Sequence, residues 1–243
     1  MDGNARRIAV TLQIGGAPVH VGATRADVLS AATLTVLAAA RAELEALGTD
    51  SHQTPSIVVS GGATTPALVR AIADSWHHAI LPTLILSDER WTTDPSMSNA
   101  HELTRHLKRS PFADCRILSP VVDGELELSA LEWSRRIESA RPPFVALLSM
   151  GDDGHIASLF PHHATESVDD SVVICRSSPK PPPTRLSLSM THVRRVPLRL
   201  LFAVGASKAT ALRRIDAGEL LPAREAQPSS WFIDEAAASE LRH

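Results

Sequence analysis

Short runs of apolar residues alternate with longer segments of helical periodicity along most of the chain. The apolar runs, which are typical of strands buried on both faces of a sheet, lie at 57–59, 81–86, 144–148 and 198–204. The helical patterns lie at 24–47, 67–77, 98–108, 128–140, 207–217 and 233–241. Because strands that alternate with helices favour a parallel sheet covered by helices, this order predicts an α/β fold.

Shorter apolar segments refine that fold. Further strands are expected at 8–12, 19–21, 116–118, 172–174 and 184–190. We expect the 170–195 region to add a few antiparallel strands to a mostly parallel sheet. The chain of 243 residues has no repeat, linker or low-complexity tract, so residues 1–243 are expected to form one domain, a three-layer α/β/α sandwich.

The composition excludes several classes of function. The net charge is −3, from 24 basic and 27 acidic residues, so no overall positive field attracts nucleic acid. No apolar run approaches the roughly 18 residues of a membrane span, and the amino terminus lacks the apolar segment of a secretory signal. Cys115 and Cys175 have no paired spacing for zinc or redox chemistry, so we expect a reduced, cytoplasmic compartment.

A glycine-rich turn at 151–155 follows the apolar run 144–148 and precedes a short helical pattern that Pro161 ends. Open α/β sheets bind ligands at the carboxyl ends of their strands, and this position carries Asp153 and His155. A histidine can take a proton at neutral pH, and a nearby carboxylate can hold it in one tautomer. The alternative is a structural turn with a capping aspartate and an incidental histidine.

The segment 149–161 resembles the signature Gly-Met-Gly-x-Asp-Gly-His-Thr-Ala-Ser-Leu-Phe-Pro of 6-phosphogluconolactonases. The differences are small: Ser149 replaces the first Gly, Ile156 replaces the Thr, and His162 follows the proline where Gly is usual. The resemblance, which extends over residues 57–235, implies hydrolysis of 6-phosphoglucono-δ-lactone to 6-phosphogluconate in the pentose phosphate pathway. It also implies the Rossmann-like fold that the family shares with glucosamine-6-phosphate deaminases and ribose-5-phosphate isomerases.

A second glycine-rich turn lies between the apolar run 57–59 and the next helical pattern. Backbone N–H groups at such a turn can bind an anion, although most glycine-rich turns are only turns. The segment 60–66 resembles the family's phosphate loop Ser-Gly-Gly-Ser-Thr-Pro, but it has one extra residue, so which threonine takes the family role stays open. The resemblance implies that phosphate is bound by Ser60, Gly61, Gly62 and Thr64 or Thr65.

Asp88 and Arg90 follow the apolar run 81–86. By themselves they form an acidic turn with a paired arginine, which is common on protein surfaces. The segment 88–99 is similar to the family element Asp-Glu-Arg-Trp-Val-Pro…Ser-Asn, with threonines at 92–93 in place of Val-Pro. The functional interpretation places Asp88 and Arg90 beside His155 at the carboxyl edge of the sheet.

Two of the chain's lysines lie in further segments of this kind. Lys180 and Arg185 flank a proline run that fixes an extended backbone, and the alternative is an exposed loop with two solvated cations. The segment is similar to the family's Pro-Lys-Pro-Pro-x-x-Arg-Ile-Thr-Leu, which implies that both contact the substrate. Lys208 stands in the first turn of a helix, where the dipole disfavours a cation. That conflict indicates a bound anion, and the family has Gly-x-x-Lys here.

Hydrolysis of a lactone needs a base to activate water and a positive group for the developing oxyanion. We assign His155 as the base, oriented by Asp153 or Asp88, and Arg90 as the electrostatic stabiliser. The phosphate is expected at the 60–65 loop, Lys208 and Arg185. No cofactor is implied. No metal is implied either, because the histidine pairs at 77–78 and 162–163 have no third ligand at a spacing typical of metal sites. The expected partner is a phosphorylated sugar lactone, bound by a monomer or homodimer.

Two other functions fit part of these features. A glucosamine-6-phosphate deaminase shares the fold and the Asp-Gly-His turn, but its signature Asp-Gly-His-Ile-Ala-Phe-Asn-Glu-Pro has Glu where this chain has Phe160. Ile156 is the one deaminase-like residue. The second alternative is a sugar-phosphate sensor that binds without turnover, although no helix-turn-helix motif accompanies the fold.

Overall fold

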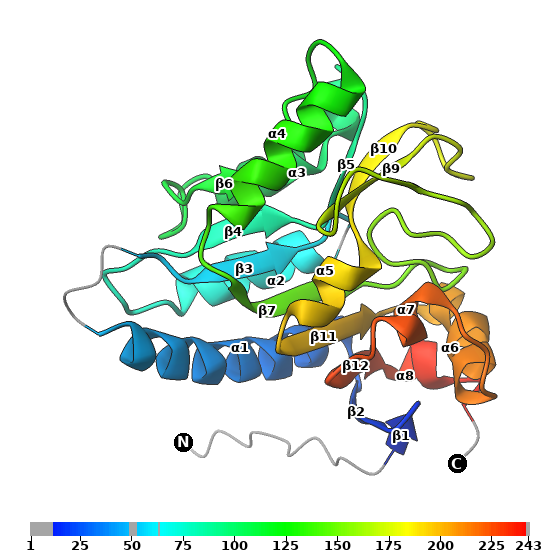
Figure 1. The fold of residues 1–243 in the computed structure, drawn as a ribbon. Helices are drawn as coiled ribbons and strands as arrows, with labels where there is room; N and C mark the ends of the chain where they lie inside the picture. Colours follow the sequence, from blue (N-terminus) through cyan, green and yellow to red (C-terminus); the bar gives the residue numbers. More distant parts are fainter. Residues whose placement is uncertain (1–11, 49–52, 63, 242–243) are drawn as a thin grey trace.

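A computed structural model describes residues 12–48, 53–62 and 64–241 (Figure 1). Within these ranges the central sheet has, in spatial order, the strands β1 (Leu12–Ile14), β2 (Ala17–Gly22), β12 (Ser230–Asp234), β11 (Leu198–Ala203), β7 (Pro143–Ser149), β3 (Ser56–Val59), β4 (Thr83–Leu86) and β6 (Ile117–Leu118). All neighbours are parallel except β1 and β2. The expected α/β fold with a mostly parallel sheet is confirmed.

The antiparallel strands expected at 170–195 belong to a second, smaller sheet. Its spatial order is β5 (Asp88–Arg90), β10 (Arg185–Leu188), β9 (Val172–Cys175) and β8 (Glu166–Ser167). The chain leaves the central sheet after Leu86 and joins the second sheet at Asp88, so that β5 connects the two. In the register of β5 and β10, Arg90 lies opposite Arg185. Two segments far apart in the sequence therefore meet at this junction.

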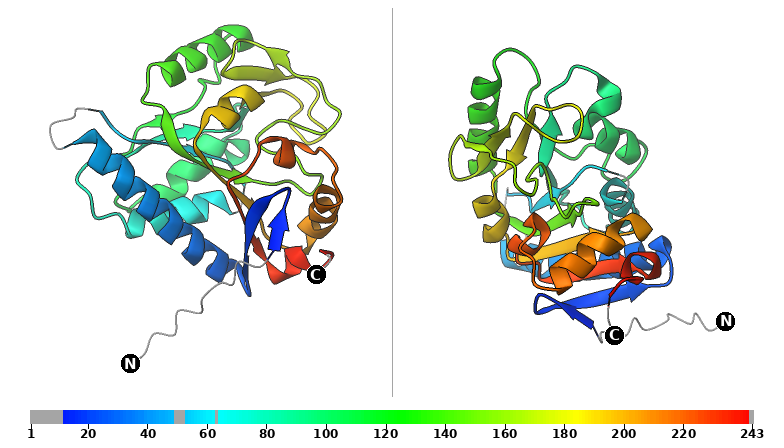
Figure 2. Two further views of the ribbon diagram at one scale, coloured as in Figure 1. Left: turned by 60° about the horizontal axis from the view of Figure 1, so that its bottom comes forward. Right: turned by 90° about the vertical axis from the view of Figure 1, so that its right-hand side faces the viewer.

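Helices flank the central sheet on both sides (Figure 2). One side carries α1 (Arg25–Leu47), α2 (Thr65–Asp74) and α3 (Asn99–Leu107). The other side carries α4 (Leu126–Glu138), α5 (Met190–Arg195), α6 (Ala209–Asp216), α7 (Pro222–Glu225) and α8 (Glu235–Ala238). Successive residues of a strand point to opposite faces of the sheet. Ile57 and Val59 therefore pack against the side that carries α1, α2 and α3, and Val58 packs against the other side. This explains why the strands read as continuous apolar runs.

Local sequence signals set the ends of several helices. The Thr24 hydroxyl accepts a hydrogen bond from the Asp27 N–H, and the Asp27 carboxylate accepts one from the Thr24 N–H, which is a complete capping box. Helix α1 ends before Gly48, which has φ of 72°. Among the helices of the described ranges, none is both long enough and apolar enough to span a membrane.

Two sequence-based expectations are wrong. No helix follows the turn at 151–155, because Ile156 forms bridges with Met150 and Leu159 and Ala157 adopts a left-handed φ of 49°. The helix expected from 233 begins at Glu235, since the preceding residues pair as β12 with β2 and β11. The strand expected at 184–190 forms as β10 over Arg185–Leu188, and α5 begins at Met190. Residues 8–11 of the first expected strand lie outside the described ranges.

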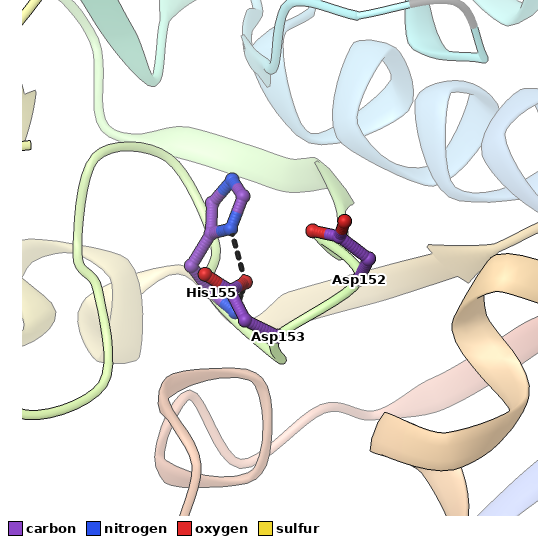
Figure 3. Close-up of side chains that lie close together, drawn as sticks. All are labelled: Asp152, Asp153 and His155. Atoms are coloured by element: carbon purple, nitrogen blue, oxygen red, sulfur yellow. Dashed lines mark hydrogen bonds and ion pairs between the residues drawn. The ribbon is translucent and has the colours of Figure 1, made fainter. Parts of the chain in front are cut away.

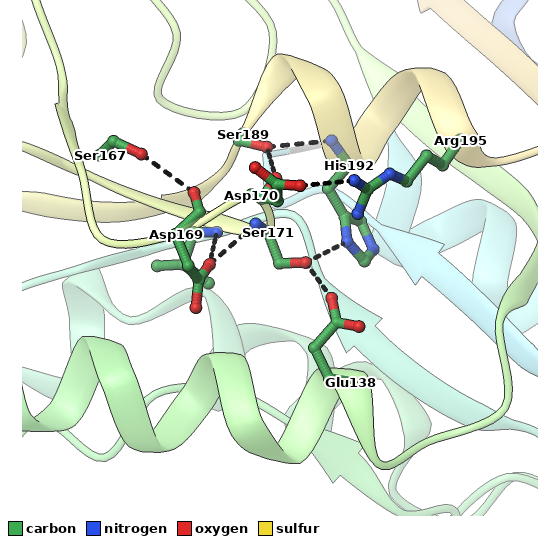
Figure 4. A network of polar contacts seen from close by, with 9 residues as sticks. Glu138, Ser167, Asp169, Asp170, Ser171, Ser189, His192 and Arg195 are labelled. Carbon is green, nitrogen blue, oxygen red and sulfur yellow. Dashed lines mark hydrogen bonds and ion pairs between the residues drawn. The ribbon is translucent and has the colours of Figure 1, made fainter.

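A polar network around the buried Ser171 and His192 joins α4, β9 and α5 (Figure 4). Ser171 donates a hydrogen bond to the Glu138 carboxylate, and His192 Nδ1 lies 2.9 Å from the Ser171 hydroxyl. His192 is only 7% exposed, and its Nε2 has no partner among the described residues. Burial lowers the pKa of His192, Arg195 adds to this effect, and the charges of Glu138 and Asp169 oppose it. The network therefore holds a neutral histidine.

We expect His192 to make the fold sensitive to acid. Its pKa is lower in the folded than in the unfolded chain, so its contribution to stability is present above the unfolded pKa of about 6.5 and is lost as pH falls through the folded pKa. Urea unfolding should therefore show a fall in stability from about pH 7 to about pH 5. His192→Asn, which keeps a donor toward Ser171, should reduce this slope, whereas the exposed control His101→Asn should keep it. Burial also lowers the pKa of His20, so part of the slope should remain.

Candidate active site

A cavity of about 470 Å³ opens at the carboxyl edge of the central sheet. The strand order reverses there, because β4 and β6 lie beyond β3 whereas β11 and β12 lie beyond β7. Open α/β sheets bind ligands at such a switch point. The predicted site residues that line the cavity are Ser60, Gly61, Gly62, Thr64, Asp88, Arg90, His155, Lys180, Arg185 and Lys208.

His155 is paired with Asp153 in the turn that follows β7 (Figure 3). The distance from His155 Nδ1 to Asp153 Oδ1 is 2.5 Å, and the same oxygen accepts the backbone N–H of His155 at 3.1 Å. Burial alone would raise the pKa of Asp153, but its interactions with His155 and Lys180 lower the pKa well below its usual value. An ionised Asp153 accepts a hydrogen bond from Nδ1–H of His155, which leaves Nε2 as the basic nitrogen.

The His155 ring is also confined by its neighbours. A Cβ atom on Gly151 would lie 2.0 Å from both Nδ1 and Cε1 of His155, so only glycine allows this approach. The Phe160 ring lies 4.5 Å from the imidazole, measured between ring centroids. The Gly151 N–H donates to the His155 carbonyl at 2.8 Å and closes the turn. Asp153, Gly151 and Phe160 together set the orientation of the histidine.

Asp88 is not brought into contact with His155. One of its carboxylate oxygens accepts a hydrogen bond from Ser87 at 3.0 Å, and the other accepts one from Ser158 at 2.7 Å. Its side chain lies in the junction between the two sheets and is 4% exposed. Of the two carboxylates that the sequence left open as partners of His155, Asp153 has the contact, and Asp88 anchors the segment after the turn.

Arg90 and Arg185 are cross-strand partners that both line the cavity. Arg90 Nη1 donates to the Met97 carbonyl at 2.8 Å, and its buried Nε has no partner among the described residues. Arg185 donates to the carbonyls of Lys180, Pro181 and Pro182. Burial lowers the pKa of Arg185 and the Arg90 charge adds to this, while the Asp88 charge opposes it. Two partly desolvated cations that line one cavity favour a bound anion.

Lys208 lies at the end of η2 (Ala206–Lys208), directly before α6. Burial lowers the pKa of Lys208, and the Lys180 charge adds to this, while Asp152 and Asp153 oppose it. A half-buried cation at the start of a helix gains stability from an anion. The ammonium group of Lys180 is paired with Asp152 across the rim of the cavity.

The 60–66 loop separates the two threonines. Thr64 lines the cavity, whereas Thr65 is buried and its hydroxyl lies 2.7 Å from that of Ser149. Asn99 is a lining residue that the sequence analysis did not select. It is 2% exposed, its Nδ2 donates to the Asp88 carbonyl at 2.9 Å, and its Oδ1 lies where a Cβ on Gly61 would clash. A signal was present, because the Ser-Asn that ends the family element of segment 88–99 falls on Ser98 and Asn99.

One group of described side chains has the composition of a metal site. Ligand atoms of Asp152, Asp153 and His155 all lie within 4.8 Å of one another. Each of them already has a partner, since Lys180 pairs with Asp152 and His155 pairs with Asp153. Their contacts are those of an ion-pair cluster at the edge of the cavity.

Comparisons with known proteins show which family this chain resembles. A family model described as "Glucosamine-6-phosphate isomerases/6-phosphogluconolactonase" matches residues 24–236. The chain is 30% identical to a 6-phosphogluconolactonase of Rattus norvegicus, over 95% of this chain and 93% of the relative. It is 31% identical to the 6-phosphogluconolactonase of Homo sapiens, over 91% and 90% of the two chains.

Solved structures of 6-phosphogluconolactonases share the fold. That of Thermotoga maritima has a TM-score of 0.77 at 20% identity and covers 89% of this chain and 99% of its own. That of Trypanosoma brucei has a TM-score of 0.73 at 21% identity and covers 92% and 98%. With a family match over most of its length, the chain belongs to the glucosamine-6-phosphate isomerase/6-phosphogluconolactonase family.

Proposed function

We propose that this protein hydrolyses 6-phospho-D-glucono-1,5-lactone to 6-phospho-D-gluconate in the pentose phosphate pathway. The observation that carries the proposal is the His155–Asp153 pair at a cavity that four cationic side chains also line. The cations suit a phosphorylated substrate, and the histidine suits the activation of water. The names of the relatives that match over nine-tenths or more of their length support the same reaction.

His155 is the general base in the mechanism that we propose. Its Nε2 accepts a proton from a water molecule, and the water oxygen attacks the carbonyl carbon of the lactone. The Arg90 guanidinium stabilises the negative charge that develops on the carbonyl oxygen. When the bond between that carbon and the ring oxygen breaks, the ring oxygen takes the proton from His155. Asp153 keeps the imidazole in the required tautomer throughout.

The phosphate of the substrate is bound away from the reacting carbon. We assign its contacts to the backbone N–H groups of Gly61 and Gly62, the Thr64 hydroxyl and the ammonium groups of Lys180 and Lys208. Arg185 adds positive charge to the cavity, and its hydrogen bonds to the carbonyls of Lys180 and Pro181 hold the proline segment in place. Binding at the phosphate end fixes the carbonyl carbon beside His155.

The test of the reaction is hydrolysis of freshly prepared 6-phosphogluconolactone, coupled to 6-phosphogluconate dehydrogenase, with the spontaneous rate subtracted. We expect turnover well above that rate. Binding of the sugar phosphate without turnover would favour a sensor. Release of ammonia from glucosamine 6-phosphate would favour the deaminase branch of the family.

Replacing Lys208 with methionine should mainly weaken substrate binding. A hydrogen bond to a charged group contributes about 1.5–3 kcal/mol, so we expect KM to rise about 10- to 100-fold with a smaller change in kcat. The matched control is Lys108→Met, because Lys108 is exposed and lies outside the cavity lining. An unchanged KM in Lys208→Met would contradict the assignment of this lysine to the phosphate.

Three further features stay predictions. We propose that residues 1–243 act as one domain, that the protein is cytoplasmic, and that it is a monomer or homodimer. Size-exclusion chromatography with light scattering would measure the last of these.

A further inference from the structure

The acidic residue Asp152 occupies the one position of the turn 151–155 that the lactonase signature leaves open. The neighbouring Asp153 is hydrogen-bonded to His155, whereas Asp152 has no role in the proposed hydrolytic mechanism. The side chain of Asp152 nevertheless points back toward the histidine (Figure 3), and one of its oxygens lies within 4.8 Å of a His155 nitrogen. A carboxylate next to a site for anions needs an explanation.

Asp152 is paired with a lysine that we assign to the substrate's phosphate. The ammonium group of Lys180 donates a hydrogen bond to Asp152 Oδ1. The two residues belong to different loops, since Asp152 follows β7 and Lys180 lies in the proline segment between β9 and β10. Their side chains are 54% and 41% exposed, so the pair lies at the rim of the cavity and an anion from solution can reach it.

The pair is made of two full charges. The hydrogen bond from Lys180 lowers the pKa of Asp152, and the charges of Lys180 and Lys208 also lower it, against a smaller effect of burial. Asp152 is therefore ionised at neutral pH and interacts with both lysines of the cavity. When a phosphate approaches the two lysines, the Asp152 carboxylate already accepts a hydrogen bond from Lys180.

We propose that the Asp152 carboxylate competes, within the molecule, with the substrate's phosphate for Lys180. The ion pair must open before Lys180 can donate to the phosphate, so Asp152 weakens the binding of phosphorylated ligands. The inference rests on the proposed function, in which Lys180 binds the phosphate end. It differs from a positioning role, in which Asp152 would hold Lys180 ready and strengthen binding.

The variant Asp152→Asn separates these two roles, because it removes the charge and keeps the shape. With inorganic phosphate as a competitive inhibitor, we expect its inhibition constant to fall about two- to fivefold at low salt, as expected for a half-exposed ion pair. KM for the lactone should also fall in Asp152→Asn. Added salt should reduce the difference between the variant and the wild type in both constants. In a Lys180→Met background, Asp152→Asn should change phosphate inhibition less than it does in the wild type, because only the weaker interaction of Asp152 with Lys208 remains.

The matched control is Asp74→Asn. Asp74 pairs with Arg70 on α2, and its side chain is 50% exposed, so this variant makes the same change in net charge in a similar ion pair outside the cavity lining. Phosphate inhibition of Asp74→Asn should equal that of the wild type. An inhibition constant that rises or stays unchanged in Asp152→Asn would overturn the competition.

The single variant Lys180→Met identifies which hypothesis has failed. If it weakens phosphate inhibition while Asp152→Asn does not strengthen it, the competition is wrong and the phosphate assignment stands. If Lys180→Met leaves phosphate inhibition unchanged, Lys180 does not bind the phosphate, and both the assignment and the competition are wrong. The coupled assay of lactone turnover tests the reaction itself independently of either result.

Discussion

Replacing His155 with glutamine should reduce kcat for lactone hydrolysis by about 10²–10⁴-fold, which is the usual contribution of one general base. Glutamine has no basic nitrogen, so water is no longer activated. The phosphate contacts come from other residues, and KM should therefore change little. The measurement is the coupled assay with the spontaneous rate subtracted, run beside the wild type.

A folded but inactive protein is the result that supports this role. The control measurement is thermal unfolding, because His155 contributes little to the buried core and the variant should keep nearly the wild-type Tm. A second variant, Asp153→Asn, should also lower kcat, since an amide does not hold the imidazole in the same tautomer as a carboxylate. If His155→Gln retained the wild-type kcat, another residue would have to be the base.

Replacing Gly151 with alanine should reduce kcat by about 100-fold, although no catalytic group is removed. The new Cβ would lie 2.0 Å from two ring atoms of His155 and 2.8 Å from Asp153 Oδ1, so the pair must move. A displacement of about 1 Å at a catalytic group is enough for a loss of that size. The same coupled assay measures the effect, with circular dichroism to verify the fold.

The matched control for this steric effect is Gly124→Ala. Gly124 has φ of 73°, and a Cβ added there would meet no other atom within 4 Å, so alanine costs backbone strain without a clash. We expect a small loss of stability and an unchanged kcat. A Gly151→Ala variant with more than about a third of the wild-type kcat would show that the turn adapts to the added methyl group.

The sequence predicted the layered fold because its main signals are local. Continuous apolar runs identified the buried strands β3, β4, β7 and β11, and caps such as Thr24 identified helix starts. The strand β12 was missed because its residues precede an alanine-rich stretch with high helical propensity. In the folded chain, pairing with β2 and β11 outweighs that propensity.

The turn after β7 was predicted from its motif only in part. The sequence places His155 in a glycine-rich turn after a strand but leaves Asp153 and Asp88 open as its partner, and in the structure the contact is with Asp153. The helix expected after the turn does not form. Ser158 instead donates to Asp88, 70 residues earlier in the chain, and its N–H donates to Ser187. These distant contacts hold the segment in an irregular path that no local pattern encodes.

The amino-acid sequence by itself determined the α/β class, the positions of most strands and the place of the glycine-rich turn at 151–155. Each of these depends on residues within a few positions of one another, where backbone geometry and burial act directly. Only the tertiary structure decided that Asp88 is held by Ser158 and does not contact His155, which threonine lines the cavity and that Arg90 lies opposite Arg185. These outcomes depend on contacts between segments that are distant in sequence, which no local pattern encodes.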